Sequence, residues 1–336
     1  MSIITYDEYQ YMLRDPDTSD EEIMEYSLVH RVKGPFDIRI TPDPAKVMMT
    51  DVDRSLENAM GIANGIARLR RQIRFHRRSI FSNLPVLVSE GDSWFQFPMI
   101  VSEVIDQLDD DFLVWSVGAA GDTLSNMVYG KRDSGHREYM DALLDKKDEV
   151  KAFLFSAAGN DIIGEDEDGT PVLTKLLKDY TGQERGIRDH INQALLEEKL
   201  EFLRKGYSKV IADVRKVPEF RKLPILIHGY DYVFPYPWGS DDPRDPIHAA
   251  NDEWLGKPLS EHGIPIRQTG REIIKTMLDD LYSMMEEIAS SDPYVHVIDC
   301  RGAMPELSDW IDEIHGTSDG FAKVAALFKA KLDEVI

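Results

Sequence analysis

The fold follows from one stretch of the sequence, Pro85-Val-Leu-Val-Ser-Glu-Gly-Asp-Ser-Trp-Phe-Gln-Phe-Pro98. Its apolar, β-branched first half predicts a short buried strand. Gly91-Asp92-Ser93 ends that strand, and apolar residues return at roughly helical spacing from Met99 to Leu108. A serine at such a turn lies at the carboxyl edge of a sheet with a helix N-terminus behind it, where a nucleophile is well placed. Ser93 is therefore a candidate nucleophile, although Gly-Asp-Ser is also ordinary turn chemistry.

Strand and helix patterns alternate from residue 85 to the C-terminus. Helical stretches lie between the strands and include Asp189–Val214 and Arg271–Ala289. This alternation predicts an α/β fold in which a parallel sheet carries helices on both faces. The candidate strands are Val86–Val88, Phe112–Val117, Lys151–Ser156, Pro224–His228 and Val295–Asp299.

Three later motifs complement the turn Gly91-Asp92-Ser93-Trp94. They are Gly118-Ala-Ala-Gly121-Asp122-Thr123, Ala158-Gly159-Asn160-Asp161 and Asp312-Glu-Ile-His315. In this order and spacing, the four motifs resemble the four blocks of the SGNH (GDSL-type) serine hydrolase family, over roughly residues 83 to 336. The sequence departs from the family pattern at Trp94, where the family name has Leu, and at Ala158, where the third block usually begins with Gly.

The resemblance implies the flavodoxin-like three-layer α/β/α sandwich of that family, and a serine esterase or lipase that hydrolyses carboxylic esters. Ser93 is then the nucleophile that forms an acyl-enzyme, and His315 is the base that later protonates the leaving alcohol. Asp312 fixes the tautomer of His315. The backbone N–H groups of Ser93 and Gly121 and the side-chain amide of Asn160 form the oxyanion hole.

The residues beside the serine bear on the substrate. Trp94, Phe95 and Phe97 slightly favour an apolar acyl group, and therefore an esterase or lipase over a carbohydrate O-acetylesterase. An acyltransferase would use the same residues and differ only in the acceptor that reaches the acyl-enzyme. Asp92 and Asp161 are interpreted as residues that shape their loops.

Two long connections leave the carboxyl ends of strands, where open α/β sheets bind ligands. They span about residues 162–187 and 230–265. The second carries alternating aromatic residues that include Tyr230 and Tyr232, which either line a substrate pocket or only anchor the loop. His228 could also line the site, but a lone histidine beside an apolar run is more often a hydrogen-bonded structural residue.

Residues 1–80 are predicted to form a mostly helical N-terminal appendage of unknown role, ahead of a hydrolase domain over residues 81–336. A helical pattern runs from about Ala45 to Ser79 through Val47 and Met48. It ends in six arginines, which are Arg68, Arg70, Arg71, Arg74, Arg77 and Arg78.

The arginine cluster has two interpretations. The favoured one is a solvated helix end whose cations suit the C-terminal helix dipole or pair with the acidic body. The other is a site for an anionic partner such as a phospholipid surface, nucleic acid or a phosphorylated ligand. A function of a different class follows from the second interpretation, in which this part of the chain is an effector module that recognises a partner and gates the hydrolase.

The composition constrains the class of protein. The chain has 336 residues, 42% of them hydrophobic, a formal net charge of −22 and a single cysteine, Cys300. The charge argues against nonspecific binding to nucleic acid, and one cysteine cannot form an internal disulfide. The sequence shows no signal-peptide pattern and no apolar run long enough to span a membrane, so a cytoplasmic protein is expected. It also shows no phosphate loop, His-Glu-x-x-His motif or dinucleotide fingerprint. The serine hydrolase mechanism that the resemblance implies requires neither a metal nor an organic cofactor, so none is expected.

Overall fold

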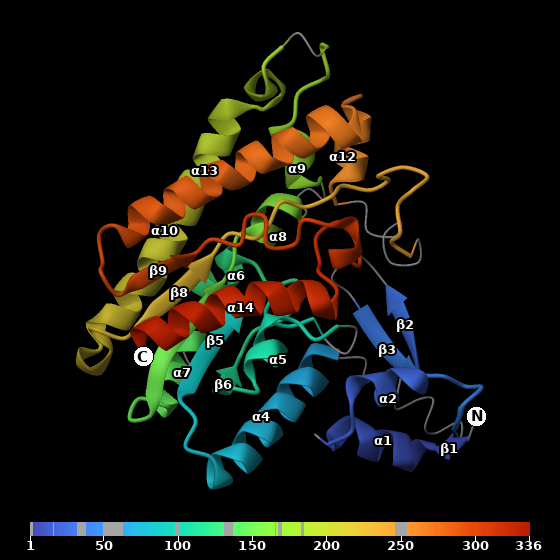
Figure 1. The fold of residues 1–336 in the computed structure, drawn as a ribbon, viewed down its shortest axis with the longest axis vertical. Helices are drawn as coiled ribbons and strands as arrows, with labels where there is room; N and C mark the ends of the chain where they lie inside the picture. The colour runs from blue at the N-terminus through green and yellow to red at the C-terminus, as the bar shows by residue number, and fades with distance from the viewer. Residues whose placement is uncertain are drawn as a thin grey trace.

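The centre of the molecule is a five-stranded parallel sheet with the strand order β6-β5-β7-β8-β9 (Figure 1). The chain winds outwards in both directions from β5, which is the flavodoxin-like order of doubly wound sheets. The fold class predicted from the sequence is therefore confirmed. The strands are β5 (Val86–Gly91), β6 (Leu113–Ser116), β7 (Val150–Ser156), β8 (Ile225–His228) and β9 (Val295–Ile298).

A computed structural model provides this fold and describes most of the chain. The described residues are 3–15, 17–31, 38–49, 63–97, 101–130, 137–164, 166, 170–182, 185–245 and 254–336. Among the helices in these ranges, none combines the length and the apolar composition that a membrane crossing requires.

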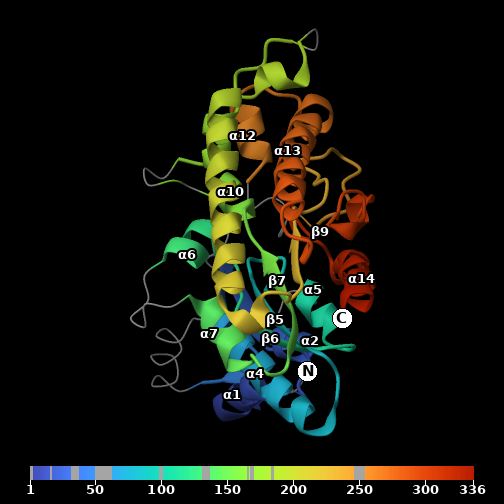
Figure 2. The same ribbon diagram turned by 90° about the vertical axis from the view of Figure 1, so that its left-hand side faces the viewer.

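Helices cover both faces of the sheet and give the molecule three layers. In Figure 2, α5 and α14 lie on one side of the sheet, and α7 and α10 lie on the other. Every residue of β5 is buried, as expected for a parallel strand that is covered on both faces. The helices are α5 (Val104–Leu108), α6 (Leu124–Tyr129), α7 (Glu138–Asp145), α10 (Gln193–Lys216), α13 (Arg271–Ala289) and α14 (Ser318–Val335).

Two helices extend past the carboxyl edge of the sheet. Helix α10 has 24 residues and spans about 36 Å at the usual rise, whereas the 7 residues of β7 span about 23 Å. Helix α13 packs against α10, and both rise above the strand ends (Figures 1 and 2). Together with the short helices α8 (Gly159–Ile163), α9 (Val172–Leu176) and α12 (Gly256–Glu261), they surround the region above the strands.

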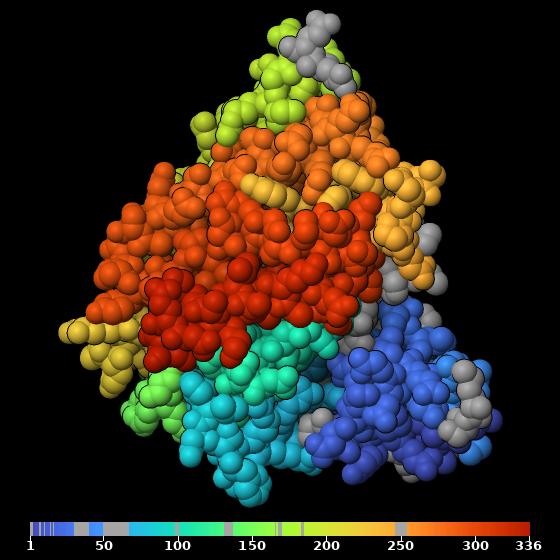
Figure 3. Space-filling view, in the orientation of Figure 1, coloured from blue at the N-terminus to red at the C-terminus, as the bar shows by residue number. Residues whose placement is uncertain are grey.

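The N-terminal part of the chain forms a small group of elements beside the sheet (Figure 1). Its residues before α4 are blue in the space-filling view of Figure 3. Helices α1 and α2 each begin with a capping box, and two pairs of short strands, β1 with β4 and β2 with β3, complete it. Helix α4 packs against β6 on one side and against α1 on the other. The elements are β1 (Ile4–Thr5), α1 (Tyr6–Arg14), α2 (Asp20–Glu25), β2 (Ser27–Arg31), β3 (Ile38–Pro42), β4 (Val47–Met48) and α4 (Ala63–Phe81).

The helix predicted over residues 45–79 is wrong at its start. Val47 and Met48 pair with the first strand of the chain, and the Val47 side chain is buried there. Asp43 shapes the preceding turn, because its carboxylate accepts the backbone N–H of Ala45 at 2.9 Å. Tertiary pairing thus overrides the helical pattern, while residues 50–62 lie outside the described residues. The division of the chain at residue 80 stays a prediction.

Candidate active site

Ser93, Asp312 and His315 form a chain of hydrogen bonds at the carboxyl edge of the sheet. The Nε2 atom of His315 lies 2.7 Å from Ser93 Oγ, and Nδ1 of His315 lies 2.8 Å from Asp312 Oδ2. A carboxylate can only accept, so Nδ1 carries the proton and Nε2 is the acceptor for the serine hydroxyl. An arrangement of this kind can activate a serine hydroxyl as a nucleophile.

The turn that carries His315 is organised by the Asp312 carboxylate. Its Oδ1 atom accepts the backbone N–H groups of Ile314 at 2.9 Å and of His315 at 2.7 Å. Burial raises the pKa of Asp312, but attraction to His315 and the hydrogen bonds outweigh burial and hold the pKa below its ordinary value. The carboxylate therefore stays ionised at neutral pH and keeps the tautomer of His315.

Aromatic rings enclose the histidine. The Phe97 ring stacks on the His315 ring with centroids 4.2 Å apart, and the Trp254 ring meets it edge-on at 5.4 Å. His315 is 0% exposed and Ser93 is 3% exposed. Fixed dipoles and charges act strongly in such a setting, because little water is present to screen them.

The nucleophile turn, residues 91–97, carries the candidate nucleophile Ser93 and is held by the Asp92 carboxylate. The Asp92 carboxylate accepts the backbone N–H of Trp94 at 3.1 Å, the Ser156 hydroxyl at 2.8 Å and the Tyr230 hydroxyl. Burial raises the pKa of Asp92, and these hydrogen bonds oppose that rise. Glycine is required just before it, because a Cβ atom at Gly91 would lie 2.8 Å from Ser156 Cβ.

The two other predicted oxyanion residues are Gly121, in a turn, and Asn160, in the short helix α8, and hydrogen bonds join these two segments. Gly121 has a φ of +82°, a conformation that favours glycine. The Asn160 side-chain amide donates to the carbonyl of Asp122 at 2.7 Å. In the opposite direction, Asp161 Oδ2 accepts the backbone N–H of Leu124 at 2.8 Å. The second and third sequence motifs therefore hold each other in place, and Asp161 shapes the loop.

Tyr230 connects the nucleophile turn to the third motif. Its hydroxyl donates to Asp92 and accepts the backbone N–H of Gly159 at 2.8 Å. Burial raises the pKa of Tyr230 well above its ordinary value, so the hydroxyl stays protonated. Tyr230 has a φ of +72° and Ala158 a φ of +94°, conformations that residues with a Cβ atom rarely adopt. The surrounding contacts must hold both residues there.

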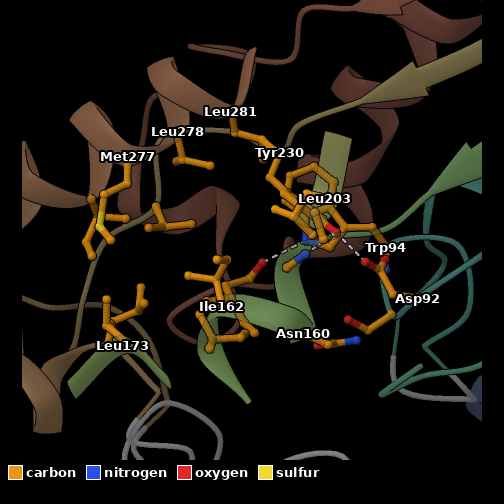
Figure 4. Close-up of a pocket in the computed structure, with 18 of the residues that line it drawn as sticks. Asp92, Trp94, Asn160, Ile162, Leu173, Leu203, Tyr230, Met277, Leu278 and Leu281 are labelled. Carbon is orange, nitrogen blue, oxygen red and sulfur yellow. Dashed lines mark hydrogen bonds between the residues drawn. The ribbon is translucent and has the colours of Figure 1, made fainter. Parts of the chain in front are cut away.

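An apolar cavity of about 100 Å³ lies beside Ser93 (Figure 4). Trp94 and Tyr230, two of the residues predicted to contact the substrate, line it together with side chains from α8, α9, α10 and α13. In Figure 4, Met277 and Leu173 lie at the end away from Asp92 and Asn160. The apolar helix residues labelled there are Ile162, Leu173, Leu203, Met277, Leu278 and Leu281.

Phe95, His228 and Tyr232, also predicted to contact substrate, are not among the described residues that line this cavity. Phe95 stacks on His228 with ring centroids 5.3 Å apart, and His228 Nε2 lies 2.8 Å from Ser156 Oγ. Burial lowers the pKa of His228 to about 3, so the ring stays neutral, as a structural residue would. The Tyr232 hydroxyl donates to Asp279 at 2.6 Å instead.

Glu313 holds the loop that was predicted to be an insertion over residues 230–265. Its buried carboxylate accepts three backbone N–H groups, from Tyr236 at 2.6 Å, Leu255 at 3.0 Å and Gly256 at 2.7 Å. Burial raises the pKa of Glu313 to about 6, although these three donors lower it. The loop is thereby attached directly to the turn that carries His315.

The six arginines of the predicted cluster all lie on α4, and each has an acidic partner. The pairs are Arg68 with Glu138, Arg70 with Asp20, Arg71 with Glu103 and Asp106, Arg74 with Asp106 and Asp109, Arg77 with Asp15 and Asp17, and Arg78 with Asp109. The predicted pairing of these cations with acidic residues is confirmed. The predicted solvation of this helix end is wrong for Arg70 and Arg71, whose side chains are only 3% and 10% exposed. An anionic partner at this helix stays a prediction.

Several residues around the site were missed at the level of sequence. Glu313 stands inside the Asp-x-x-His motif and Trp254 inside a predicted loop, so the segments were right but no pattern singled out these side chains. Arg244 donates to the carbonyl of Asp312 at 3.0 Å, and Arg71 donates to the carbonyl of Phe95 at 2.8 Å. Such contacts join distant segments and leave no local signal.

Comparison with solved structures finds similar folds at low identity. A candidate platelet activating factor from Streptococcus pneumoniae is 13% identical, with 84% of this chain and 98% of that one covered at a TM-score of 0.43. A candidate GDSL-like lipase from Bacteroides ovatus is 10% identical, with coverages of 75% and 53% and a TM-score of 0.42. An inhibitor-bound aryl esterase from M. smegmatis is 13% identical, with coverages of 75% and 100% and a TM-score of 0.41.

One of these three structures is described as a lipase and one as an esterase, and their likeness to this chain is one of fold. No protein-family model matches the chain. No curated protein matches it either.

The contacts of Tyr230 predict that Tyr230→Phe lowers the free energy of unfolding by about 2 kcal/mol, because Asp92 and the Gly159 N–H both lose a buried partner. Tyr232→Phe is the matched control, since it also removes a tyrosine–aspartate hydrogen bond, but at a partly exposed position where water can replace it. We expect a loss below about 1 kcal/mol there. Urea unfolding followed by circular dichroism measures both, and equal losses would contradict the prediction.

The environment of Glu313 predicts a pH-dependent contribution to stability. Its pKa is about 6 in the folded protein against an ordinary 4.5, so the folded state binds the proton more tightly. The stabilisation is therefore complete below pH 4.5 and is lost as the pH rises through 6. Glu313→Gln cannot titrate, so the stability of wild type relative to this variant should fall by about 2 kcal/mol between these limits. Urea unfolding of both proteins across this range tests this, and a constant difference would exclude it.

Proposed function

We propose that this protein hydrolyses carboxylic esters through a covalent acyl-enzyme on Ser93. The observation that carries the proposal is the hydrogen-bonded chain from Ser93 Oγ to His315 Nε2 at 2.7 Å and from His315 Nδ1 to Asp312 at 2.8 Å. A serine hydroxyl is a poor nucleophile unless a neighbouring base takes its proton, and the His315 nitrogen is within reach to do so.

In the first half of the reaction, Ser93 Oγ attacks the ester carbonyl carbon while its proton passes to His315 Nε2. The imidazolium that forms lies against the Asp312 carboxylate, which stabilises the positive charge. The tetrahedral intermediate then expels the alcohol, which leaves with the proton from His315. Ser93 is left as an ester of the acyl group.

The negative charge on the former carbonyl oxygen needs hydrogen-bond donors. We assign this role to the N–H groups of Ser93 and Gly121 and to the Asn160 amide. An amide nitrogen carries two N–H groups, so Asn160 can donate to Asp122 and still offer a donor toward the cavity that it lines. Loss of one such donor typically costs roughly 3 to 4 kcal/mol of transition-state stabilisation.

In the second half, His315 Nε2 takes a proton from water as the water oxygen attacks the acyl-enzyme. The new tetrahedral intermediate releases the carboxylic acid, and the proton on His315 returns to Ser93 Oγ. The cycle therefore needs only the ester, water and these side chains. An acyltransferase would follow the same steps with an alcohol acceptor in place of water.

The cavity beside Ser93 favours an apolar acyl group over acetyl. Its walls above the strand ends are leucine, isoleucine and methionine side chains from α8, α9, α10 and α13. Burial of each CH₂ group of an acyl chain there contributes about 0.8 kcal/mol. A sugar acetate would leave this apolar surface unused, so we place esterase or lipase activity ahead of carbohydrate deacetylation.

Ser93→Ala should lower kcat/KM on p-nitrophenyl esters by at least about 10³-fold, because the acyl-enzyme can no longer form. The same variant should not react with a fluorophosphonate probe. Ser89→Ala is the matched control, since Ser89 is buried in the preceding strand and its hydroxyl has no hydrogen-bond partner among the described residues. We expect its activity to equal that of wild type. Full activity of Ser93→Ala would refute the proposal.

The position of Met277 at the far end of the cavity predicts opposite changes in acyl-chain preference for two substitutions (Figure 4). Met277→Trp should shorten the longest chain that is hydrolysed efficiently, and Met277→Ala should lengthen it. Acetyl esters should react at similar rates in both, because their acyl group does not reach this residue. Rates over a series from acetyl to long-chain p-nitrophenyl esters measure the shift, and unchanged profiles in both variants would argue against this acyl pocket.

A further inference from the structure

Helix α4 contacts the two segments that carry Ser93 and Gly121, which are assigned to catalysis. The nucleophile turn follows β5, and the loop that carries Gly121 follows β6. The two are adjacent, because the backbone N–H of Ala119 donates to the carbonyl of Gly91 at 2.8 Å. Arg68 and Arg71 reach from α4 to these loops, although α4 precedes both of them in the chain and belongs to the N-terminal part.

Arg71 binds the nucleophile turn directly. Its Nη1 atom donates to the carbonyl of Phe95 at 2.8 Å and to Gln96 Oε1 at 3.3 Å. Its Nη2 atom pairs with Glu103 and lies 3.0 Å from Asp106 Oδ2. The Arg71 side chain is 10% exposed and that of Glu103 is 0% exposed. A planar guanidinium can make all these contacts at once, which an ammonium group cannot do.

Glu103 extends this support to the start of α5. Its Oε2 atom accepts the backbone N–H of Ile105 at 2.8 Å, which caps the helix that follows the nucleophile turn. Removal of Arg71 would leave the Glu103 carboxylate buried with less opposite charge nearby, a strongly unfavourable state. The turn and the helix after it thus share one cation from α4.

Arg68 binds the second loop in the same manner. Its Nε atom donates to the carbonyl of Gly118 at 2.7 Å, and its Nη2 atom donates to the carbonyl of Val117. Its Nη1 atom pairs with Glu138 at 3.1 Å. The two carbonyls lie where β6 ends and the loop to Gly121 begins. Arg68 therefore fixes the direction in which this loop leaves the sheet.

We propose that Arg68 and Arg71 are positioning residues of the hydrolase, and that helix α4 is an integral part of the catalytic unit rather than of an appendage. Arg71 holds the turn that presents Ser93, and Arg68 holds the loop that presents the Gly121 N–H. The inference rests on the proposed function, which assigns catalytic roles to Ser93 and Gly121. The rigidity of the two loops can also be measured without catalysis.

The helix offers a matched control. Arg77 lies on the same helix, but its side chain is 54% exposed and pairs with Asp15 and Asp17 of the N-terminal part. Arg77→Met removes the same charge from the same helix without touching the two loops. Arg68→Met and Arg71→Met remove the guanidinium and keep most of the apolar stem.

The experiment measures kcat and KM on a p-nitrophenyl ester together with hydrogen exchange of backbone amides in the full-length protein. In Arg71→Met we expect kcat to fall by about 10²-fold with little change in KM, because misplacement of the nucleophile affects the chemical step. Amides in residues 89–97 should exchange at least about tenfold faster. In Arg68→Met the faster exchange should lie in residues 117–124, whereas Arg77→Met should match wild type in both measurements.

Three results would overturn the inference. They are a folded Arg71→Met protein with wild-type kcat, unchanged exchange in both loops, and equal effects in Arg77→Met. If Arg71→Met does not fold, Arg71→Lys keeps the charge but cannot make the full set of contacts, so it should lose kcat, and wild-type kcat in that variant would also overturn the inference. If the wild-type protein neither hydrolyses esters nor reacts with a fluorophosphonate, the proposed function fails, while the exchange data still decide whether the arginines hold the loops.

Discussion

The buried carboxylate of Asp92 connects the ends of three neighbouring strands, and the geometry of the site depends on it. It stands directly after β5, accepts the hydroxyl of Ser156 at the end of β7, and accepts the hydroxyl of Tyr230 from the segment after β8. Through Tyr230 it also reaches the backbone of Gly159. Parallel strands bring their carboxyl ends to one edge by topology alone, but they do not set the ångström-scale positions of the residues there. Hydrogen bonds to one acceptor-only group supply that alignment, because each donor must approach it along a restricted direction.

The same device recurs in the rest of the site. Asp161 accepts backbone N–H groups at the start of α6, Asp312 accepts those of its own turn, and Glu313 accepts three from the long loop. Burial of a carboxylate is costly in free energy unless hydrogen bonds compensate for the lost water. If the loop moved away, the carboxylate would remain buried without its hydrogen-bond donors, and water could not replace them. Each of these carboxylates therefore favours one arrangement of its loop. Part of the strongly acidic composition of this chain is thus internal structure, and net charge alone does not reveal that use.

The sequence predicted the layered fold and the grouping of the motifs well, for a physical reason. Buried parallel strands are short, apolar and β-branched, so β5 to β9 could be located to within a few residues. Ser93 and His315 are 222 residues apart and meet at 2.7 Å, an outcome expected from the family resemblance and not from the spacing. The support given by Arg71 could not be predicted, because an arginine cluster on a helix has the same sequence pattern whether its side chains face water or backbone carbonyls. The helix walls of the cavity were not predicted either, because the apolar faces of α10 and α13 have the pattern of ordinary core helices.

The length of those two helices explains why the cavity exists. A helix that only covered the sheet would end near the strand ends, and its apolar face would be fully used against the strands. Helix α10 continues beyond β7, so part of its apolar face, including Leu196, Leu200 and Leu203, has no sheet beneath it. That face packs against α13, and the gap that remains above the strand ends opens toward Ser93. The apolar face of α10 that packs against α13 thus also forms the cavity wall that an acyl chain would contact. Under the proposed function, helix packing would set the acyl preference of the site, and the short sequence motifs that carry Ser93, Asp312 and His315 do not encode that packing.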